Sequence, residues 1–366
     1  MANEWIGVVN ATAPKYLTGA QNNTIRNRLL LMLLQRYGRM EFNQNGYVLR
    51  WDVQFDEPPA ETYGDAGVFE FARHDVLRTL ELSWGGYLAN DLMTYKEKAM
   101  NDGNVAIVRR YDRIMPNLEA SLQNKFCAEL YGTSSGDPNR IDGLETFFAN
   151  NGTTVAADRI ATPSGTYGGK SCTLAAETGS WSSNLAVSPN AALAKDWPSG
   201  SGDARYDWNS YKKVNWSSTN WGTGSTAWED NCERALRQTF LWLTHTGGRD
   251  GRPTIALLSQ DLFYAYQNKQ EAKQRIIVPH KEASDLGFPD TLNQEGVMIR
   301  HEYDVPANVG YVLNVFQMML SSLYSQLFWN VGPYDNPSKL RYEFLVGFFG
   351  NVRYTVKHMA KLEAVA

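Results

Sequence analysis

Residues Asn101–Gly132 read NDGNVAIVRRYDRIMPNLEASLQNKFCAELYG, and this pattern predicts one long helix. Its apolar side chains recur at steps of three and four, which places them on one helical face. They are Ile107, Tyr111, Ile114, Leu118, Leu122, Phe126 and Leu130. At 1.5 Å per residue such a helix is roughly 40 Å long. We therefore expect it to be a beam across which other elements pack.

The ends of this segment carry helix signals. Asp102 suits the positive end of the helix dipole, and Gly132 stands where a left-handed C-terminal cap is expected. Pro116 cannot donate its backbone hydrogen bond, so we expect a bend there. Four basic residues occupy other faces of the helix, namely Arg109, Arg110, Arg113 and Lys125.

The composition is that of an ordinary folded protein. The chain has 366 residues, of which 43% are hydrophobic and 20% charged, and its net charge is -4. This balance excludes intrinsic disorder and gives no overall field that would attract nucleic acid. Three scattered cysteines, Cys127, Cys172 and Cys232, are predicted to be small buried side chains. The longest apolar run, Leu29–Leu34, is too short for a membrane span, so we expect a soluble, cytosolic chain without membrane contact.

A long hairpin is predicted before the beam. Gly46–Phe55 alternates with period two, and a second strand, about Arg73–Trp84, returns after an acidic, proline-stiffened tip. An isolated two-stranded hairpin is marginal in water and leaves its edges unpaired. It therefore needs a surface to lie on, and another subunit can supply one.

The rest of the chain mixes helices and strands, which places it in the α+β class. A short arm (residues 1–23) precedes the hairpin, and residues 150–226 are rich in Gly, Ser, Thr, Asn and Trp, as in a surface insertion of turns and short strands. The other predicted elements include helices over Thr24–Tyr37, Leu88–Ala99, Thr226–Leu243 and Ser259–Ile276. Strands are predicted over Thr254–Leu258, Val297–Arg300 and Gly310–Val315, followed by a final strand pair, Leu340–Phe349 and Val352–Leu362, broken at Gly350-Asn351.

No motif assembles an active site. Gly168-Gly169-Lys170-Ser171 resembles the end of a phosphate loop but lacks the first glycine, because Ser164 stands in its place. The turn-like run 247–252 (GGRDGR) could cradle an anion, although a plain turn is favoured. The five histidines show no metal-ligand spacing, so no catalytic, cofactor or metal residue is predicted. Five Trp in the 150–226 region suit structural or interface roles better than ligand binding.

The order of elements resembles the major capsid protein of tailed bacteriophages (Caudoviricetes), the Hong Kong 97-type fold. Three pieces in the C-terminal half carry the likeness best: Gly296-Val297-Met298-Ile299, Asp304-Val305-Pro306 and Tyr311-Val312-Leu313-Asn314. The resemblance implies an N-terminal arm, an extended hairpin called the E-loop, a peripheral domain with a long spine helix, and an axial domain. In this chain the parts are 1–44 (arm), 45–86 (E-loop), 87–148 (peripheral domain, spine helix 101–131), 149–226 (insertion), 227–335 (axial domain) and 336–366 (return to the peripheral domain).

The resemblance also implies a structural role rather than an enzymatic one. Such a chain self-assembles through pentamers and hexamers into an icosahedral shell in the virion, built in the host cytoplasm. Its implied partners are a portal protein and double-stranded DNA contacted non-specifically on the inner face. The fold-like sequence starts within about two dozen residues, which favours a separate scaffolding protein. The archetype crosslinks its E-loop through lysine, whereas this chain has no lysine between Lys15 and Lys96.

The predicted subunit contacts join the hairpin to the long helix. The acidic tip needs basic partners, and the helix arginines are candidates. The residues assigned to contacts are Trp51, Glu57, Glu61, Trp84, Arg109, Arg110 and Arg113. Two other functions stay open: an encapsulin-type bacterial compartment shell, and a carbohydrate-binding protein that uses the Trp-rich region.

Overall fold

The computed structural model describes residues 28–58, 60, 62, 71–100, 110–148, 158–182, 196–271 and 292–364. Its helices and strands are, in chain order, α2 (Leu29–Arg36), β1 (Met40–Glu41), β2 (Leu49–Gln54), β3 (Leu77–Leu82), β4 (Gly85–Thr94), α3 (Tyr95–Met100), α4 (Arg110–Glu129), α5 (Glu145–Phe148), β5 (Ile160–Ala161), β6 (Thr166–Tyr167), β7 (Lys170–Ser171), β8 (Trp181–Ser182), α6 (Asp196–Ser199), β9 (Ser201–Gly202), β10 (Lys212–Asn215), α7 (Trp228–Gly247), β11 (Ile255–Leu258), α8 (Gln260–Glu271), β12 (Leu292–Gln294), β13 (Val297–His301), β14 (Val309–Leu313), β15 (Met318–Ser322), β16 (Trp329–Asn336), β17 (Arg341–Tyr354) and β18 (Ala360–Glu363).

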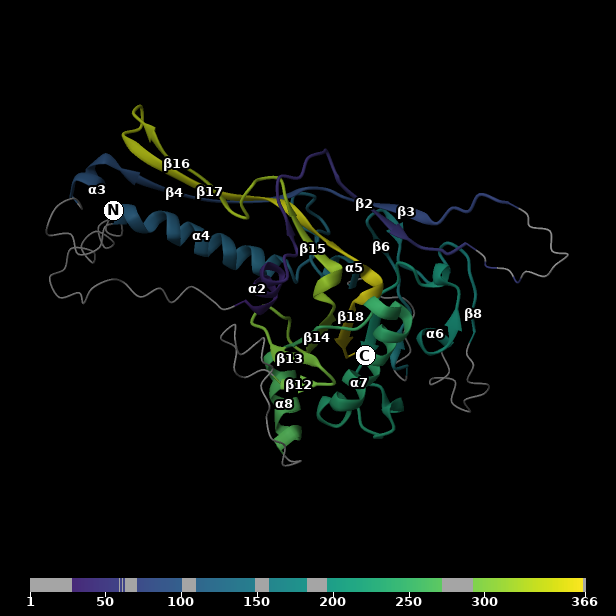
Figure 1. Cartoon of the computed structure of the whole chain (residues 1–366). Helices are drawn as coiled ribbons and strands as arrows, with labels where there is room; N and C mark the ends of the chain where they lie inside the picture. Colours follow the sequence, from purple (N-terminus) through teal and green to yellow (C-terminus); the bar gives the residue numbers. More distant parts are fainter. Residues whose placement is uncertain are drawn as a thin grey trace.

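Two long projections leave a central body on opposite sides (Figure 1). One is the β2–β3 hairpin. The other consists of β4, β16 and β17 with helix α4 running along them. The body below holds a seven-stranded sheet together with α7 and α8.

The seven-stranded sheet has the order β12-β13-β11-β14-β18-β10-β5. Its third strand, β11, is buried along its whole length. Ile255 and Leu257 enter one core, which also contains α4, whereas Ala256 and Leu258 enter the second core with α7 and α8. Successive strand residues point to opposite faces, so a strand covered on both sides must be apolar throughout. The predicted strands over 254–258, 297–300 and 310–315 are confirmed.

The second sheet is organised around β17. Its C-terminal part pairs with β15, and its N-terminal part pairs with β16 on one side and β4 on the other, all antiparallel. Helix α4 covers one face of this projection, where the ring centroids of Phe126 and Phe348 lie 4.8 Å apart. The opposite face has no described element over it in Figure 1.

Helix α4 confirms the predicted apolar stripe. Ile114, Leu122, Phe126 and Leu130 are each at most 2% exposed, and the helix continues through Pro116. The first nine residues of the predicted helix, 101–109, lie outside the described residues. Gly132 is not the left-handed cap that was expected. Instead the helix ends in a tight turn, in which the Gly132 N–H donates to the Glu129 carbonyl at 2.9 Å.

The predicted helix over Leu88–Ala99 is wrong for its first part, residues 88–94. Residues Gly85–Thr94 form strand β4, and only Tyr95–Met100 is helical. Leu88 and Leu92, four residues apart, fit a helical face and also the same face of a strand. Pairing with β17 over ten consecutive residues decides the conformation.

The predicted break at Gly350-Asn351 is also wrong, because β17 runs through it without interruption. Glycine is needed at position 350 for close approach rather than for a turn. A Cβ there would lie 2.3 Å from the Ser321 carbonyl oxygen of the neighbouring strand. A glycine in a strand-like stretch can mark either a turn or the close approach of another backbone, and the sequence alone does not distinguish the two.

Two segments are more integrated than expected. Helix α2 lies in the predicted arm 1–44, yet Leu29–Leu34 is buried almost completely in the main core. Strands β5 and β10 lie in the predicted surface insertion 149–226, yet both belong to the seven-stranded sheet. Over its described residues, this region is therefore part of the body.

Candidate functional site

The root of the β2–β3 hairpin rests on its own chain. The Glu81 N–H donates to the Gly168 carbonyl at 3.1 Å. Gly168 has φ +59° and lies so close to Leu80 that a Cβ would meet that side chain at 2.6 Å. The β6–β7 turn that resembled a phosphate loop is therefore the seat of the hairpin.

Both predicted contact tryptophans lie at this root and are half-buried. The ring of Trp51 packs 6.2 Å from that of Tyr167, centroid to centroid. Tyr167 is anchored in turn, because its hydroxyl accepts a 3.0 Å bond from the Tyr354 N–H of β17. Trp84 Nε1 donates to the Gly46 carbonyl at 3.0 Å and so ties the two hairpin strands together.

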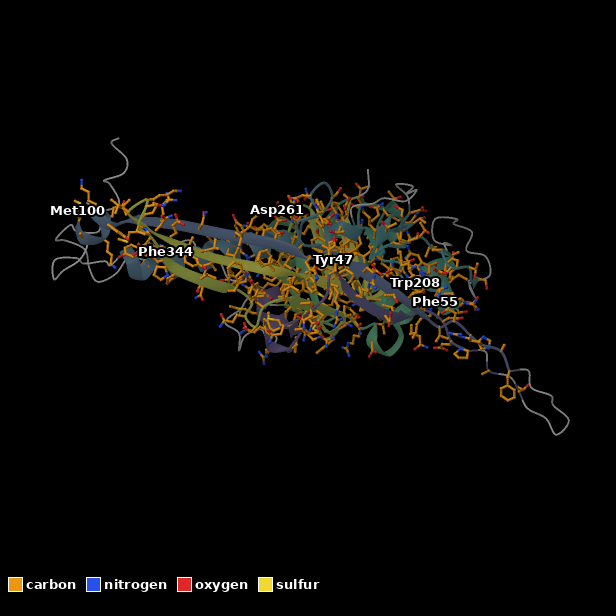
Figure 2. The ribbon with its side chains drawn as sticks, turned by 90° about the horizontal axis from the view of Figure 1, so that it is seen from above. Tyr47, Phe55, Met100, Trp208, Asp261 and Phe344 are labelled. Atoms are coloured by element: carbon orange, nitrogen blue, oxygen red, sulfur yellow. The ribbon has the colours of Figure 1, made fainter. Side chains whose placement is uncertain are left out.

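Beyond the root, aromatic and charged contacts hold both strands. Phe55 packs edge-on against Trp208 at 6.0 Å, and the two lie side by side in Figure 2. The Arg78 guanidinium lies 4.1 Å above the Phe55 ring and pairs with Glu177 at 3.0 Å. Hydrogen bonds to Glu177 and Asp75 raise the pKa of Arg78.

The acidic tip has one described ion pair, and its partner is in the same chain. Asp56 pairs with Arg205, whose Nε lies 3.2 Å from Asp56 Oδ1. Glu57 is exposed. The predicted contacts Glu61 and Arg109 lie outside the described residues, as does the side chain of Arg110. Arg113 is half-buried on α4, so the pairing of the tip with helix arginines stays a prediction.

The face of the β4–β17–β16 sheet that points away from α4 carries exposed apolar side chains with polar ones among them, including Asn90 and Glu343. Leu88 is 59%, Leu92 43% and Tyr334 53% exposed. Leu92 and Tyr334 both lie beside Glu343 of β17, one on each side, and line a shallow groove of about 440 Å³. Exposed apolar side chains that gather on one face of a monomer often mark a contact with a partner. We call these three residues and Leu345 the outer face.

A buried ion cluster fixes the point where the N-terminal segment enters the body. Arg28 forms an ion pair with Asp304, and the Leu29 N–H at the start of α2 donates to Glu302 Oε2 at 3.2 Å. Burial raises the pKa of Glu302 to about 7. The hydroxyl of Tyr131 and the thiol of Cys127 belong to the same surroundings.

The Trp-rich region does not form a ligand-stacking surface over its described residues. Trp197, Trp208 and Trp221 are at most 6% exposed, and Trp181 and Trp216 are half-buried. The indole groups of Trp197 and Trp221 also hydrogen-bond within the fold; Trp221 Nε1, for example, donates to the Asn215 carbonyl at 2.9 Å. The expectation that these residues act structurally is confirmed, and the carbohydrate-binding alternative loses its stacking platform.

Little in the described part of the chain suits metal or cofactor chemistry. No group of three or more His, Cys, Asp or Glu side chains gathers there as a metal site would require. The three cysteines are free and buried, as predicted. Among the described helices, none combines the length and apolar character needed to cross a bilayer.

No protein-family model and no curated protein sequence matches the chain. Solved structures do match it along nearly its whole length. A chain of the cyanophage A-1(L) capsid asymmetric unit has a TM-score of 0.56 and 13% identity, covering 96% of this chain and 97% of its own. The chain has the fold of phage capsid proteins.

Two further structures share this capsid fold. The capsid of a native GTA particle matches with a TM-score of 0.56 and 11% identity over 100% of both chains. The capsid of cyanophage P-SCSP1u matches with a TM-score of 0.52 and 10% identity over 98% of this chain and 94% of its own. The predicted capsid fold of the α+β class is thereby confirmed.

Two features of this structure were not predicted from the sequence, namely the outer face and the support of the hairpin by residues 167–208 of its own chain. The outer face was not predicted because residues 88–99 were assigned to a helix. The period-two spacing of Leu88 and Leu92, read as a strand, was the available signal. The contacts of Arg205, Glu177 and Trp208 with the hairpin were missed because those residues were placed in a surface insertion. No local pattern marks them, since their partners are more than 90 residues away along the chain.

Proposed function

We propose that this chain is the major capsid protein of a tailed bacteriophage. Copies assemble through pentamers and hexamers into an icosahedral shell that encloses double-stranded DNA. The observation that carries the proposal is the likeness to capsid chains over 94–100% of both partners. A shared fold does not by itself fix a function, so the site must supply the rest of the argument.

The site supplies two complementary features. The hairpin extends from the body beyond its root (Figure 2), and Phe71, six residues before β3, is fully exposed. The outer face, on the opposite projection, presents exposed apolar side chains on an uncovered side of a sheet. We propose that the hairpin of one copy lies over the outer face of the next. Such a head-to-tail contact closes into rings when the rotation between neighbours permits.

The division into domains follows the same reading. Residues 45–86 are the E-loop, 87–148 with 336–366 the peripheral domain, and 227–335 the axial domain. The sheets shift two of these boundaries, because β15 and β16 pair within the sheet of β4 and β17, whereas β18 lies in the seven-stranded sheet of the body. Strands β5 and β10 of the 149–226 region then complete the axial sheet. Residues 1–44 contribute the arm, with α2 as its anchored root.

The remaining partners are those of a virion shell. A separate scaffolding protein and a portal protein act during assembly in the host cytoplasm, and DNA is contacted non-specifically on the inner face. The net charge of -4 is compatible with contacts to DNA through local basic surface only. The chain has a structural role and performs no catalysis.

Size-exclusion chromatography with light scattering, followed by electron microscopy of the largest species, tests the proposal. The chain is expressed alone and with candidate scaffold proteins from the same genome. Megadalton shells, or rings of five and six subunits, are expected. A monomer under all these conditions contradicts the proposal. Shells that enclose a co-purified enzyme in place of nucleic acid indicate the encapsulin-type compartment.

A further inference from the structure

The hairpin has an inner support and an outer support. The inner support is apolar and tightly packed, with Leu80 against Gly168 and Trp51 against Tyr167. Tyr167 is bonded to β17, so this support is continuous with the central sheet. It fixes the position of the hairpin root.

The outer support combines the packing of Phe55 on Trp208 with two ion pairs, one at each strand. Asp56, two residues after β2, meets Arg205, while Arg78 of β3 meets Glu177. The charges are arranged in opposite senses: the hairpin supplies the acid in one pair and the base in the other. The four side chains are 17–43% exposed, so both pairs are in contact with water.

Glu177 and Arg205 are parts of one platform, which we define as residues 175–179 and 203–206. The Ala175 N–H donates to the Tyr206 carbonyl at 2.8 Å. Gly179 lies so close that a Cβ there would meet the Tyr206 nitrogen at 3.1 Å. The tilt and twist of the hairpin relative to this platform are therefore held at two points that cannot move independently.

We infer that the Asp56–Arg205 and Arg78–Glu177 ion pairs set the direction in which the hairpin leaves the body, and through it the curvature of the assembled shell. The inference rests on the proposed function. A rotation of about 5° displaces a point about 35 Å away, which is roughly the reach of ten extended residues, by about 3 Å. A contact between copies registers such a shift as a changed angle.

Ion pairs in contact with water contribute little to global stability, so their removal is expected to leave the fold intact. The loss of both contacts with the platform is expected to widen the range of directions that the hairpin adopts. The matched control is Arg237–Glu295, an exposed ion pair between α7 and the β12–β13 turn that has no contact with the hairpin. The variants are Glu177→Gln, Arg205→Gln, their combination, and Arg237→Gln as control.

The first measurement is made on the unassembled full-length chain. Spin labels are placed at Phe71→Cys on the hairpin and Asp261→Cys on α8, both exposed, while the three native cysteines are buried. The distance distribution between the labels is expected to broaden at least twofold in the combined variant and to stay unchanged in Arg237→Gln. An unchanged distribution in the combined variant overturns the inference.

The second measurement is the diameter of assembled particles by electron microscopy. The combined variant is expected to at least double the share of particles of aberrant diameter. A charge exchange in the parent chain, Asp56→Arg with Arg205→Asp, keeps an ion pair at this place and is expected to leave the parent diameter unchanged. Identical diameters overturn the link to curvature. Absence of particles from the parent chain contradicts the proposed function instead, and the label distances then decide the hairpin part alone.

Discussion

Asn351 and Asp142 face each other in the interior and are joined by two hydrogen bonds. Asn351 Nδ2 donates to Asp142 Oδ2 at 2.7 Å, and Asn351 Oδ1 accepts from the Asp142 N–H at 2.9 Å. The same Nδ2 donates to the Ser83 carbonyl at 2.7 Å, just after the hairpin. One buried amide thus joins β17, the loop after α4 and the hairpin root.

Asn351→Ala is expected to destabilise the chain by about 3 kcal/mol. It leaves the Asp142 carboxylate and the Ser83 carbonyl without this donor in a buried site, and each such loss costs about 1–3 kcal/mol. Urea unfolding of the unassembled chain measures the change. Asn268→Ala on the exposed side of α8 is the control, expected within about 0.5 kcal/mol of the parent. Equal effects for the two variants would show that the amide has no such role.

Glu302→Gln is expected to remove a pH dependence of stability. Burial raises the pKa of Glu302 from 4.5 to about 7, while Asp304, Arg28 and Arg300 act on it from neighbouring positions. The stabilising effect of its protonated form is complete below pH 4.5 and is lost as the pH rises through 7. The parent should therefore lose up to roughly 3 kcal/mol from this group between pH 4.5 and 8.

The glutamine variant retains an oxygen for the Leu29 N–H and no longer titrates. It should be more stable than the parent at pH 8 and similar to it at pH 4.5. Urea unfolding at both pH values provides the comparison. If the parent and the variant respond alike to pH, another group is responsible.

Gly168→Ala is expected to disturb the seat of the hairpin, whereas Gly169→Ala is expected to be milder. Both glycines have positive φ, so both variants bear the same kind of backbone strain. A Cβ at 168 meets Leu80 at 2.6 Å, whereas a Cβ at 169 meets no atom within 4 Å. The difference in unfolding free energy between the variants should be about 2 kcal/mol. Similar values for the two would argue against a tight seat.

Leu92→Asp on the outer face is expected to prevent or strongly weaken assembly while leaving the monomer folded. Burial of a leucine contributes about 1.5–3 kcal/mol, which is tenfold or more in each association constant. Leu241→Asp on α7, also exposed at 54%, is the control. Sedimentation velocity gives the assembled fraction and circular dichroism the fold. Normal assembly of Leu92→Asp would remove the outer face from the contact.

Charge reversal at the hairpin tip, Glu57→Lys with Glu61→Lys, is expected to impair assembly and leave the monomer folded. The reason is the proposed pairing of the acidic tip with helix arginines of a neighbouring copy. Arg113→Glu combined with the reversed tip should restore part of the assembly. Electron microscopy of particle yield measures both effects. Normal particles from the reversed variant would refute the pairing.

Side-chain periodicity was sufficient to predict those elements whose tertiary contacts favour the same conformation as their local sequence. The stripe from Ile114 to Leu130 specifies a helix with one buried face, and the alternation of 49–54 specifies a strand. The order of these elements was sufficient to predict the capsid fold. The helix prediction for the first part of Leu88–Ala99 was wrong because the spacing of its leucines fits both the helical and the strand period. The turn prediction at Gly350-Asn351 was wrong because a turn and a close approach between strands both favour glycine.

The sequence by itself determined the long helix, the hairpin, the apolar strands of the body and their order along the chain. Each depends on side-chain periodicity, which acts between residues close in sequence. Only the tertiary structure decided that β4 is a strand, that Gly168, Arg205 and Trp208 support the hairpin, and that Glu302 lies buried beside Arg28. These features come from contacts between residues about 90 to 280 positions apart, and no local pattern records which distant groups will meet.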